Sequence, residues 1–430
     1  MRTLIKNCTA VLPQQTTLTN ILIENSKIAA VDAPPTTQAD LTIDAKGKYL
    51  IPGLIDDQVH FREPGFTHKE DLTTASRSCV LGGVTSFLEM PNTNPNTTSQ
   101  AALEQKLALA KEKSRANYGF YIGATPSNYQ ELKYAKRTPG IKIFVGSSTG
   151  NLLVDDQNAL ETIYKETTLR ICVHAEDETT IRENKKRIGN TTDVRDHSKI
   201  RDHLAAFTAT KRIKDLSEHF QHHTHILHVS SHTELPLLSS KFLSSEACVH
   251  HLLLNTNDYN TLGNLIQMNP SIKGPEDNLA LWNALKDGTI DIIATDHAPH
   301  TLIEKAAPYP ASPSGMPGVQ TMLTLLLNEV ANQRITIEQL VKWTSENPAR
   351  IWKIQNKGAI KEGYDADLVL VDMNATKTIR TEEQASKCGW TPWHGRTTTG
   401  WPTHTFVMGQ LAMADGKLFD DVRGQELLFG

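Results

Sequence analysis

Short apolar runs alternate with segments of helical periodicity through the middle of the chain, and this alternation limits the folds open to it. Eight runs have the length and composition of buried strands: residues 54–60, 85–90, 118–123, 141–145, 170–176, 225–231, 249–255 and 291–298. Between some of them, residues 101–114, 199–220 and 320–331 carry apolar side chains at helical spacing. Repeated strand–helix units build parallel sheets. The sequence therefore predicts an α/β fold, a (β/α)8 barrel of the TIM type.

Both ends of the chain differ from the middle in sequence pattern, because they consist of short β-rich runs separated by turn residues. Such runs occur near residues 4–5, 21–24, 28–31 and 41–44, and again at 367–371, 405–408 and 411–413. A chain of 430 residues exceeds the usual domain size but fits a barrel of about 250 residues plus a smaller module. We expect residues 53–352 to form the barrel and residues 1–52 and 353–430 to form one small β domain together.

Composition favours a small molecule as the partner. The net charge is -4, from 44 basic and 48 acidic residues, so nothing in the overall charge indicates binding to nucleic acid or to an anionic membrane. The five cysteines are scattered, as expected for reduced thiols. No signal peptide is evident and no apolar run approaches the roughly 18 residues of a membrane span, so we expect a cytoplasmic protein. Homodimers are common among such barrels, but nothing in the sequence indicates an interface.

Five polar side chains fall in or at the ends of predicted strands, where barrel enzymes carry their catalytic groups. They are His60, Lys142, His174, His228 and Asp296. A single His at such a position is more often a hydrogen-bonded core residue, but a Lys and an Asp in otherwise apolar strands are costly unless paired. The coincidence of all five predicts a metal site. For the lysine alone, the alternatives are a side chain that reaches out of the barrel mouth or one that pairs with an acid.

The first predicted strand suggests what lies beside that metal. Gln58, His60 and Arg62 occupy alternate positions and so share one strand face. A neutral imidazole suits a divalent metal, whereas a guanidinium suits a carboxylate. This pairing predicts metal-assisted chemistry on an acidic substrate.

Residues 52–65 closely resemble the opening motif of dihydroorotases in the cyclic-amidohydrolase superfamily, where an Asp-x-His-x-His strand is followed by Arg-Glu-Pro-Gly. Residues 345–351 and 363–370 resemble the closing helix of that superfamily and its return to the β domain. The resemblance covers nearly the whole chain. In one position it fails, because Gln58 stands where the family has its first histidine.

The resemblance implies a role for each metal-type residue. It implies that Lys142 is N-carboxylated and bridges two Zn²⁺ ions, that His174 and His228 hold the second ion, and that His60 and Asp296 hold the first. It further implies that Asp296 acts as general base. The amide oxygen of Gln58 is a weaker and harder ligand than imidazole, so we expect either a loosely held first ion or one well-occupied zinc. Both outcomes are compatible with hydrolysis.

Three further matches name the substrate. Dihydroorotases bind the ring carboxylate of dihydroorotate with an Arg, an Asn and a His. The matching residues in this sequence are Arg62, Asn92 and His300. The alternative for Arg62 is an ion pair with Glu63 or Asp71. The resemblance therefore implies a zinc-dependent, reversible hydrolysis of (S)-dihydroorotate to N-carbamoyl-L-aspartate, a step of pyrimidine (UMP) synthesis.

Two softer matches complete the predicted site. Asn269, in residues 268–273, matches a segment that contacts the pyrimidine ring, although Lys273 replaces an Arg of the family. Thr149, in the small and hydroxyl-rich segment 146–150, matches a loop threonine of the family and would form part of a lid, with a plain surface turn as the alternative. Two other functions stay open. They are another cyclic amidase of the hydantoinase, dihydropyrimidinase or allantoinase type, and a non-catalytic scaffold, which the substitution at Gln58 motivates.

Overall fold

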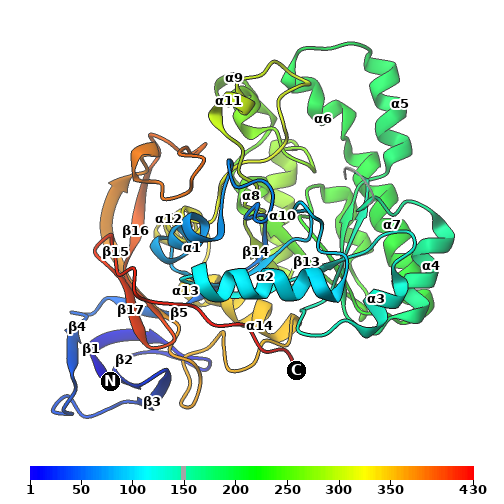
Figure 1. Cartoon of the computed structure of the whole chain (residues 1–430). Coiled ribbons are helices and arrows are strands. Elements are labelled where there is room, and N and C mark those ends of the chain that lie inside the picture. Colours follow the sequence, from blue (N-terminus) through cyan, green and yellow to red (C-terminus); the bar gives the residue numbers. More distant parts are fainter. Residues whose placement is uncertain (147–151) are drawn as a thin grey trace.

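Eight parallel strand segments close into the predicted barrel in a computed structural model that describes residues 1–146 and 152–430 (Figure 1). In order they are β6 (Leu54–Val59), β7 (Val84–Glu89), β8 (Asn117–Phe120) continued by β9 (Ile122–Gly123), β10 (Ile141–Val145), β11 (Ile171–Ala175), β12 (Thr224–Ile226), β13 (Leu243–Cys248) and β14 (Ile292–Ala294). The ring closes where Val59 pairs with His297, whose carbonyl accepts the His60 N–H at 2.8 Å. The predicted α/β barrel is confirmed.

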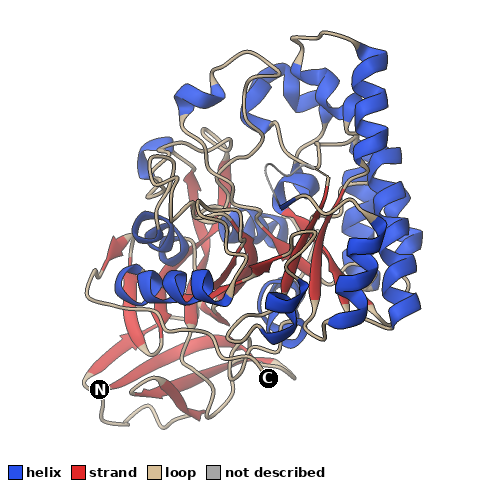
Figure 2. Ribbon diagram, turned by 45° about the vertical axis from the view of Figure 1, so that its right-hand side comes forward, coloured by secondary structure: helices blue, strands red, loops and turns tan. Residues whose placement is uncertain are grey.

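Helices surround the strands (Figure 2). Their bounds are α1 (Leu72–Leu81), α2 (Gln100–Lys113), α3 (Tyr129–Tyr134), α4 (Gln157–Glu166), α5 (Glu178–Ile188), α6 (His197–Ile200), α7 (His203–Phe220), α8 (Val249–Leu253), α9 (Tyr259–Leu262), α10 (Pro275–Asp287), α11 (Leu302–Lys305), α12 (Met322–Ala331), α13 (Ile337–Val341) and α14 (Asn347–Ile351). In α2 the Ser99 side chain caps the first turn, and Leu103, Leu107 and Ala110 form the buried stripe. The helices predicted near 101–114 and 320–331 are thus confirmed as α2 and α12.

The helix predicted over residues 199–220 is wrong as a single element. It is two helices, because Arg201 and Asp202 interrupt the pattern between α6 and α7. The Asp202 side chain accepts the Ala205 N–H at 3.0 Å and caps α7, which buries Ala205, Ala209 and Ile213 toward the barrel. A capping residue in the middle of a helical pattern, here Asp202, therefore marked the start of a second helix.

The seventh predicted strand is also wrong. The strand is β13, residues 243–248, and the apolar run placed at 249–255 begins helix α8. β13 stays buried despite its polar composition because its side chains are paired within the barrel. His225 lies 2.8 Å from Ser244 Oγ through Nδ1 and 3.1 Å from Glu246 Oε2 through Nε2. Hydrophobicity alone misplaces a strand whose inner face is satisfied by hydrogen bonds.

Strands from both ends of the chain form one nine-stranded sheet at the lower left of Figure 1. Its order is β18 (Lys417–Leu418), β17 (Gln410–Ala414), β16 (Thr397–Val407), β15 (Leu368–Thr378), β5 (Tyr49–Pro52), β1 (Arg2–Val11), β2 (Thr16–Glu24) and β3 (Lys27–Val31), with β4 (Leu41–Asp44) paired to β1. The two ends meet where β5 pairs antiparallel with β15, from Leu368 opposite Pro52 to Val371 opposite Tyr49. This sheet confirms that the ends of the chain build a separate β domain.

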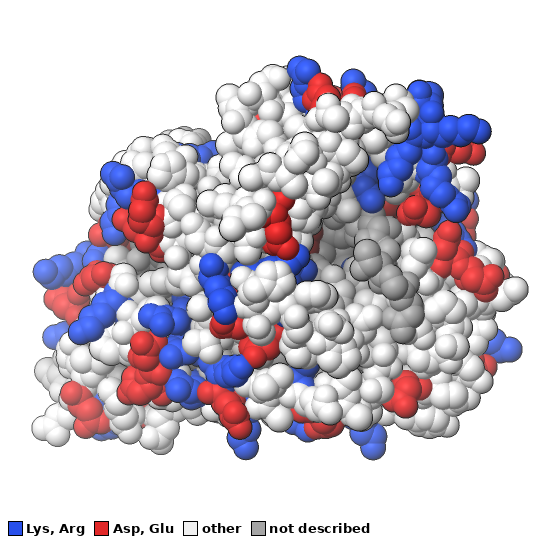
Figure 3. All heavy atoms as spheres, turned by 45° about the horizontal axis from the view of Figure 1, so that its top comes forward, with Lys and Arg blue, Asp and Glu red and all other residues white. Residues whose placement is uncertain are grey.

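The surface carries both signs of charge. Lys and Arg side chains lie among Asp and Glu at the left and lower left of the face shown in Figure 3, with a group of cations at its upper right. Every helix in residues 1–146 and 152–430 falls short of the combination of length and apolarity that a membrane-crossing segment needs.

Candidate active site

One pocket of about 120 Å³ gathers ten of the eleven side chains expected from the sequence. It is lined by Gln58, His60, Arg62, Asn92, Lys142, His174, His228, Asn269, Asp296 and His300, together with Phe144, Met268, Ala298, Ser314 and Gly315. The eleventh, Thr149, lies outside the described residues, as does most of the lid expected at 146–150. The pocket sits at the carboxyl ends of the barrel strands, where such folds carry their chemistry.

Several of these side chains follow a strand rather than lying in it. Lys142 and His174 are within β10 and β11, whereas His60 comes directly after β6. His228 and Asp296 each lie two residues beyond the last residue of β12 and β14, so the strands predicted over 225–231 and 291–298 are too long. These positions allow the side chains to turn into the pocket.

The backbone at three of these positions is strained. Arg62, His228 and Asp296 have φ values of 67°, 38° and 46°, in the left-handed region that non-glycine residues rarely adopt. Each such residue costs on the order of 1–3 kcal/mol and persists only where its surroundings impose it. Strain of this kind at three residues of one pocket favours a functional reason for their placement.

His60 and Asp296 form one pair of facing ligand atoms. His60 Nε2 lies 3.0 Å from Asp296 Oδ1, and His60 Nδ1 lies 2.7 Å from Asn92 Oδ1. The amide oxygen can only accept, so Nδ1 carries the hydrogen and Nε2 presents its lone pair. Burial lowers the pKa of His60, against the opposing effect of Asp296, and this keeps the ring neutral. A neutral ring with a fixed tautomer is the form that binds metal.

His174 and His228 form a second facing pair, with His174 Nδ1 2.9 Å from His228 Nε2. The other nitrogen of His174, Nε2, lies 2.9 Å from Glu176 Oε2, which also accepts from Arg201 Nη1 at 2.6 Å. Burial alone would raise the pKa of Glu176, but Arg201 holds it well below its usual range, so the carboxylate stays charged. The charged acceptor fixes the hydrogen of His174 on Nε2 and leaves Nδ1 free to bind a cation.

Lys142 points into the same pocket. Its side chain is 1% exposed, so it does not reach out of the barrel mouth, and among the described residues no ion pair to an acid is found. The Nζ atom lies 4.4 Å from the centroid of the Phe144 ring. Burial lowers the pKa of Lys142 to about 8. With this pKa, part of the Lys142 population is a neutral amine near neutral pH. The neutral amine is the form that reacts with carbon dioxide.

The pocket also contains polar atoms that lack a partner among the described residues. Gln58 Oε1 and His228 Nδ1 are buried and accept or donate no hydrogen bond there. Buried polar atoms are usually paired, so an unpaired acceptor in the pocket of His60 is an atom to which a cation could bind. Two zinc ligands at about 2.05 Å in tetrahedral geometry lie about 3.3 Å apart, close to the spacing of both facing pairs. The donor set therefore fits a divalent metal, with Gln58 as an oxygen donor where the family has imidazole.

A cationic end of the pocket faces this donor set. Arg62 is buried, donates from Nε to the Pro299 carbonyl at 3.1 Å, and has Nη2 3.3 Å from His300 Nε2. The alternative ion pairs of Arg62 are not formed, because Glu63 pairs with Lys113 and Asp71 with Lys387.

The cationic end of the pocket also includes the neutral ring of His300 and a second cation, Lys69. Burial, assisted by Arg62 and by Lys69, lowers the pKa of His300 well below its usual range. Lys69 Nζ lies 3.1 Å from His300 Nδ1 and 2.9 Å from Glu304 Oε1. Because Lys69 can only donate, Nδ1 accepts and the ring hydrogen lies on Nε2, which faces the Ser314 carbonyl at 3.1 Å. An anionic group bound here would find free donors on Arg62 and on the amide of Asn92, beside the Nε2–H of His300.

Three residues around the site were missed by sequence reasoning. Glu176 and Arg201 hold His174, and Lys69 supplies the second cation near His300. A signal existed only for Glu176, which follows directly after an apolar strand. Arg201 and Lys69 lie in connecting segments, where a basic residue is unremarkable.

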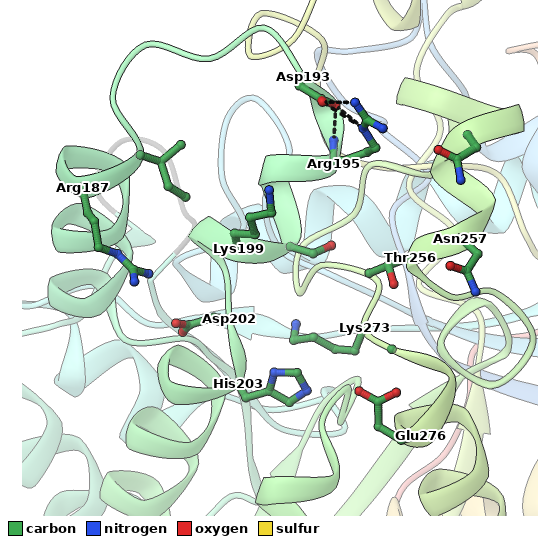
Figure 4. A pocket seen from close by; sticks show the side chains of 14 residues that line it. Arg187, Asp193, Arg195, Lys199, Asp202, His203, Thr256, Asn257, Lys273 and Glu276 are labelled. Atoms are coloured by element: carbon green, nitrogen blue, oxygen red, sulfur yellow. Dashed lines mark hydrogen bonds and ion pairs between the residues drawn. The ribbon is translucent and has the colours of Figure 1, made fainter.

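A larger cavity of about 920 Å³ lies elsewhere, among α5, α6, α7 and the start of α10 (Figure 4). It shares no lining residue with the candidate active site. Figure 4 shows charges of both signs around it, with Asp193 and Arg195 already paired to each other. Its size alone therefore gives no chemical assignment.

Known proteins place this chain in a family. A model described as "Amidohydrolase family" matches residues 49–412. The chain belongs to the amidohydrolase family. This amidohydrolase is 34% identical over 417 residues to a protein named dihydroorotase from Methanosarcina acetivorans, with 93% of this chain and 89% of the relative covered. A dihydroorotase from Methanosphaera stadtmanae is 34% identical over 427 residues, covering 96% and 97%.

Solved structures show the same fold. L-hydantoinase (dihydropyrimidinase) from Arthrobacter aurescens superposes with a TM-score of 0.92 at 27% identity and covers 97% of each chain. Dihydropyrimidinase from Brevibacillus agri superposes with a TM-score of 0.90 at 24% identity, covering 97% and 96%. This amidohydrolase is thus of the cyclic-amide type, and the resemblance to dihydroorotases seen in the sequence is confirmed at the level of homology.

Proposed function

We propose that this amidohydrolase is a dihydroorotase, which interconverts (S)-dihydroorotate and N-carbamoyl-L-aspartate. The observation that carries the proposal is the pocket itself, in which a metal-type donor set and buried Arg62 face one small volume. Dihydroorotate has both matching groups, a cyclic amide to hydrolyse and a ring carboxylate to neutralise. Relatives named dihydroorotase at 34% identity support this choice of substrate.

Zinc would be held by His60, Asp296, His174, His228 and carboxylated Lys142, and would supply activated water and a polarised ring carbonyl. Gln58 would add its unpaired amide oxygen. Lys142 contributes because its neutral amine can lose a proton and form an N–C bond to carbon dioxide, giving an anionic carbamate in place of a cation. That change removes the repulsion an ammonium group would exert on metal.

The chain's own groups then orient the substrate and move one proton. Arg62 donates two parallel hydrogen bonds to the ring carboxylate and Asn92 donates from the side. The Nε2–H of His300, which faces the Ser314 carbonyl at 3.1 Å, is shared between that carbonyl and the carboxylate. Asn92 has its amide nitrogen available because its oxygen already faces His60. The Asp296 carboxylate accepts a proton from the attacking water and returns it to the ring nitrogen as the amide bond breaks. In ring closure Asp296 takes the proton from the ureido nitrogen instead.

The test is turnover of zinc-loaded protein in both directions, with hydantoin and dihydrouracil as cyclic amides that lack the carboxylate. We expect turnover of dihydroorotate and a loss of about 30-fold to several thousand-fold in kcat/KM for Arg62→Ala, because breaking a buried charge pair costs about 2–5 kcal/mol. Arg195→Ala, in the larger cavity, is the matched control and leaves kcat/KM unchanged.

Two rival functions have distinct outcomes in this experiment. A hydantoinase-type enzyme would cleave hydantoin and keep its hydrolysis of dihydroorotate in Arg62→Ala. A non-catalytic scaffold would load metal and turn over none of the three substrates. Either result would replace the proposal.

A further inference from the structure

A second group of metal-type side chains is buried outside the candidate active site. Cys248 is the last residue of β13, and His250 and His251 lie in the first turn of α8. Each offers one ligand atom within 4.8 Å of the other two. Their exposures are 0%, 2% and 2%, and none of them lines the candidate active site. A thiol and two imidazoles so close together, with no solvent, need an explanation.

Each imidazole of this group has one nitrogen engaged and one nitrogen bare. His251 Nε2 lies 3.1 Å from the Pro270 carbonyl, which can only accept, so Nε2 carries the hydrogen and Nδ1 has a lone pair. His250 makes a hydrogen bond to the backbone of Thr295. His250 Nε2 and His251 Nδ1 have no hydrogen-bond partner among the described residues. Metal-binding histidines typically use one nitrogen in this way, to fix the ring while the other binds the ion.

The two other groups of potential ligands in the described residues differ in this respect. In the group of Asp57, His225 and Glu246, both ring nitrogens of His225 are engaged, by Ser244 and Glu246. In the group of His203, His232 and Asp277, both rings are bonded to the carboxylate and are partly exposed. The group of Cys248, His250 and His251 therefore differs from the other two in having buried ring nitrogens without a hydrogen-bond partner among the described residues.

Burial keeps all three ligand groups of this cluster neutral. Burial raises the pKa of Cys248 well above its usual value, and the carboxyl groups of Glu246 and Asp296 raise it further. Burial lowers the pKa of His250 to about 4 and that of His251 well below its usual range. Without an ion the group is therefore one neutral thiol and two neutral rings.

We propose that Cys248, His250 and His251 bind one soft cation with a filled d shell, Zn²⁺ or Cu⁺, at a site separate from the catalytic pocket. Thiolate and imidazole are the ligands that such cations prefer. Binding forms one metal–sulfur and two metal–nitrogen bonds and releases the thiol proton to solvent. The ion ties the end of β13 to the neighbouring Thr295 and Pro270 segments, because both rings are anchored there.

The test uses the full-length protein, stripped with a chelator and titrated with Co²⁺. A thiolate bound to Co²⁺ absorbs strongly in the near ultraviolet by charge transfer. No cysteine is among the residues lining the catalytic pocket, so this band reports on the proposed site alone. We expect the band in the wild-type protein, its loss in Cys248→Ser, and its retention in Cys172→Ser, a matched control in which another fully buried barrel thiol is removed.

Two further measurements distinguish this metal site from the metal site proposed in the catalytic pocket. The band persists in His60→Ala, which disturbs only the catalytic set. Elemental analysis of protein purified without chelator shows whether zinc or copper is bound, and Cys248→Ser lowers that content by about one ion per chain. A wild-type titration without the band would overturn the proposal and requires no variant to fold. A band that survives in Cys248→Ser would do the same.

Discussion

A buried ion pair behind the pocket makes a quantitative prediction. Lys106 Nζ lies 2.7 Å from Glu89 Oε2, and both side chains are almost fully buried. The other carboxylate oxygen, Glu89 Oε1, accepts the Phe61 N–H at 2.9 Å, between site residues His60 and Arg62. Burial raises the pKa of Glu89, while Lys106 opposes this. The pair therefore supports the backbone that carries two site residues.

Lys106→Met leaves the Glu89 carboxyl buried without its cation. We expect a loss of about 3–5 kcal/mol in the free energy of unfolding near neutral pH, measured from urea transitions. The double variant Glu89→Gln, Lys106→Met is the matched control, because the new amide keeps an acceptor for the Phe61 N–H and carries no charge. It should recover most of the loss, since a buried pair replaced on both sides is often close to neutral in stability.

The pH dependence gives the same prediction a second test. In Lys106→Met the folded-state pKa of Glu89 rises further above the unfolded value of about 4.3. Between the two pKa values the folded state holds a proton that the unfolded state has lost, so stability falls as pH rises. The slope approaches about 1.4 kcal/mol per pH unit relative to the double variant. A deficit that is equal at about pH 5 and pH 8, or a double variant no more stable than the single one, would refute the reasoning.

Three other perturbations follow from the contacts of the site and the fold. Glu176→Gln removes the charged acceptor of His174, so we expect about 10- to 100-fold weaker metal binding, measured by competition with a chelator. Gln58→His restores an imidazole, and we expect a higher zinc content after dialysis than in the wild-type protein, by elemental analysis. Asp202→Ala removes the cap of α7 and should cost about 1 kcal/mol of unfolding free energy, whereas Asp215→Ala on the exposed face of the same helix should cost little.

The barrel was predictable because most of its strands are apolar on both faces, as parallel strands covered by helices must be. β13 was not, since Ser244 and Glu246 are buried by pairing with His225, a residue about twenty positions earlier that no local pattern connects to them. The cap at Asp202 was readable in principle, but a nearly continuous helical pattern outweighed it.

The candidate site divides in a similar way. His60, Lys142, His174, His228 and Asp296 were recognisable because polar groups stood in or beside apolar runs, and the structure brings them to one pocket. Their supporting partners were not recognisable. Arg201 reaches Glu176 across 25 positions, and Lys69 reaches His300 across 231, so only the folded chain shows those contacts. The unpaired state of Gln58 Oε1 is also visible only in three dimensions.

The pairing of β5 with β15 has a consequence for how the protein is made. More than 300 residues separate Pro52 from its partner Leu368, so the first strands leave the ribosome long before the strand that completes their sheet. Until then β5 presents an unpaired edge, a template for pairing with other chains. Biosynthesis of this enzyme thus includes a long interval in which that edge of β5 has no partner strand. Premature termination before residue 368 would make that exposure permanent.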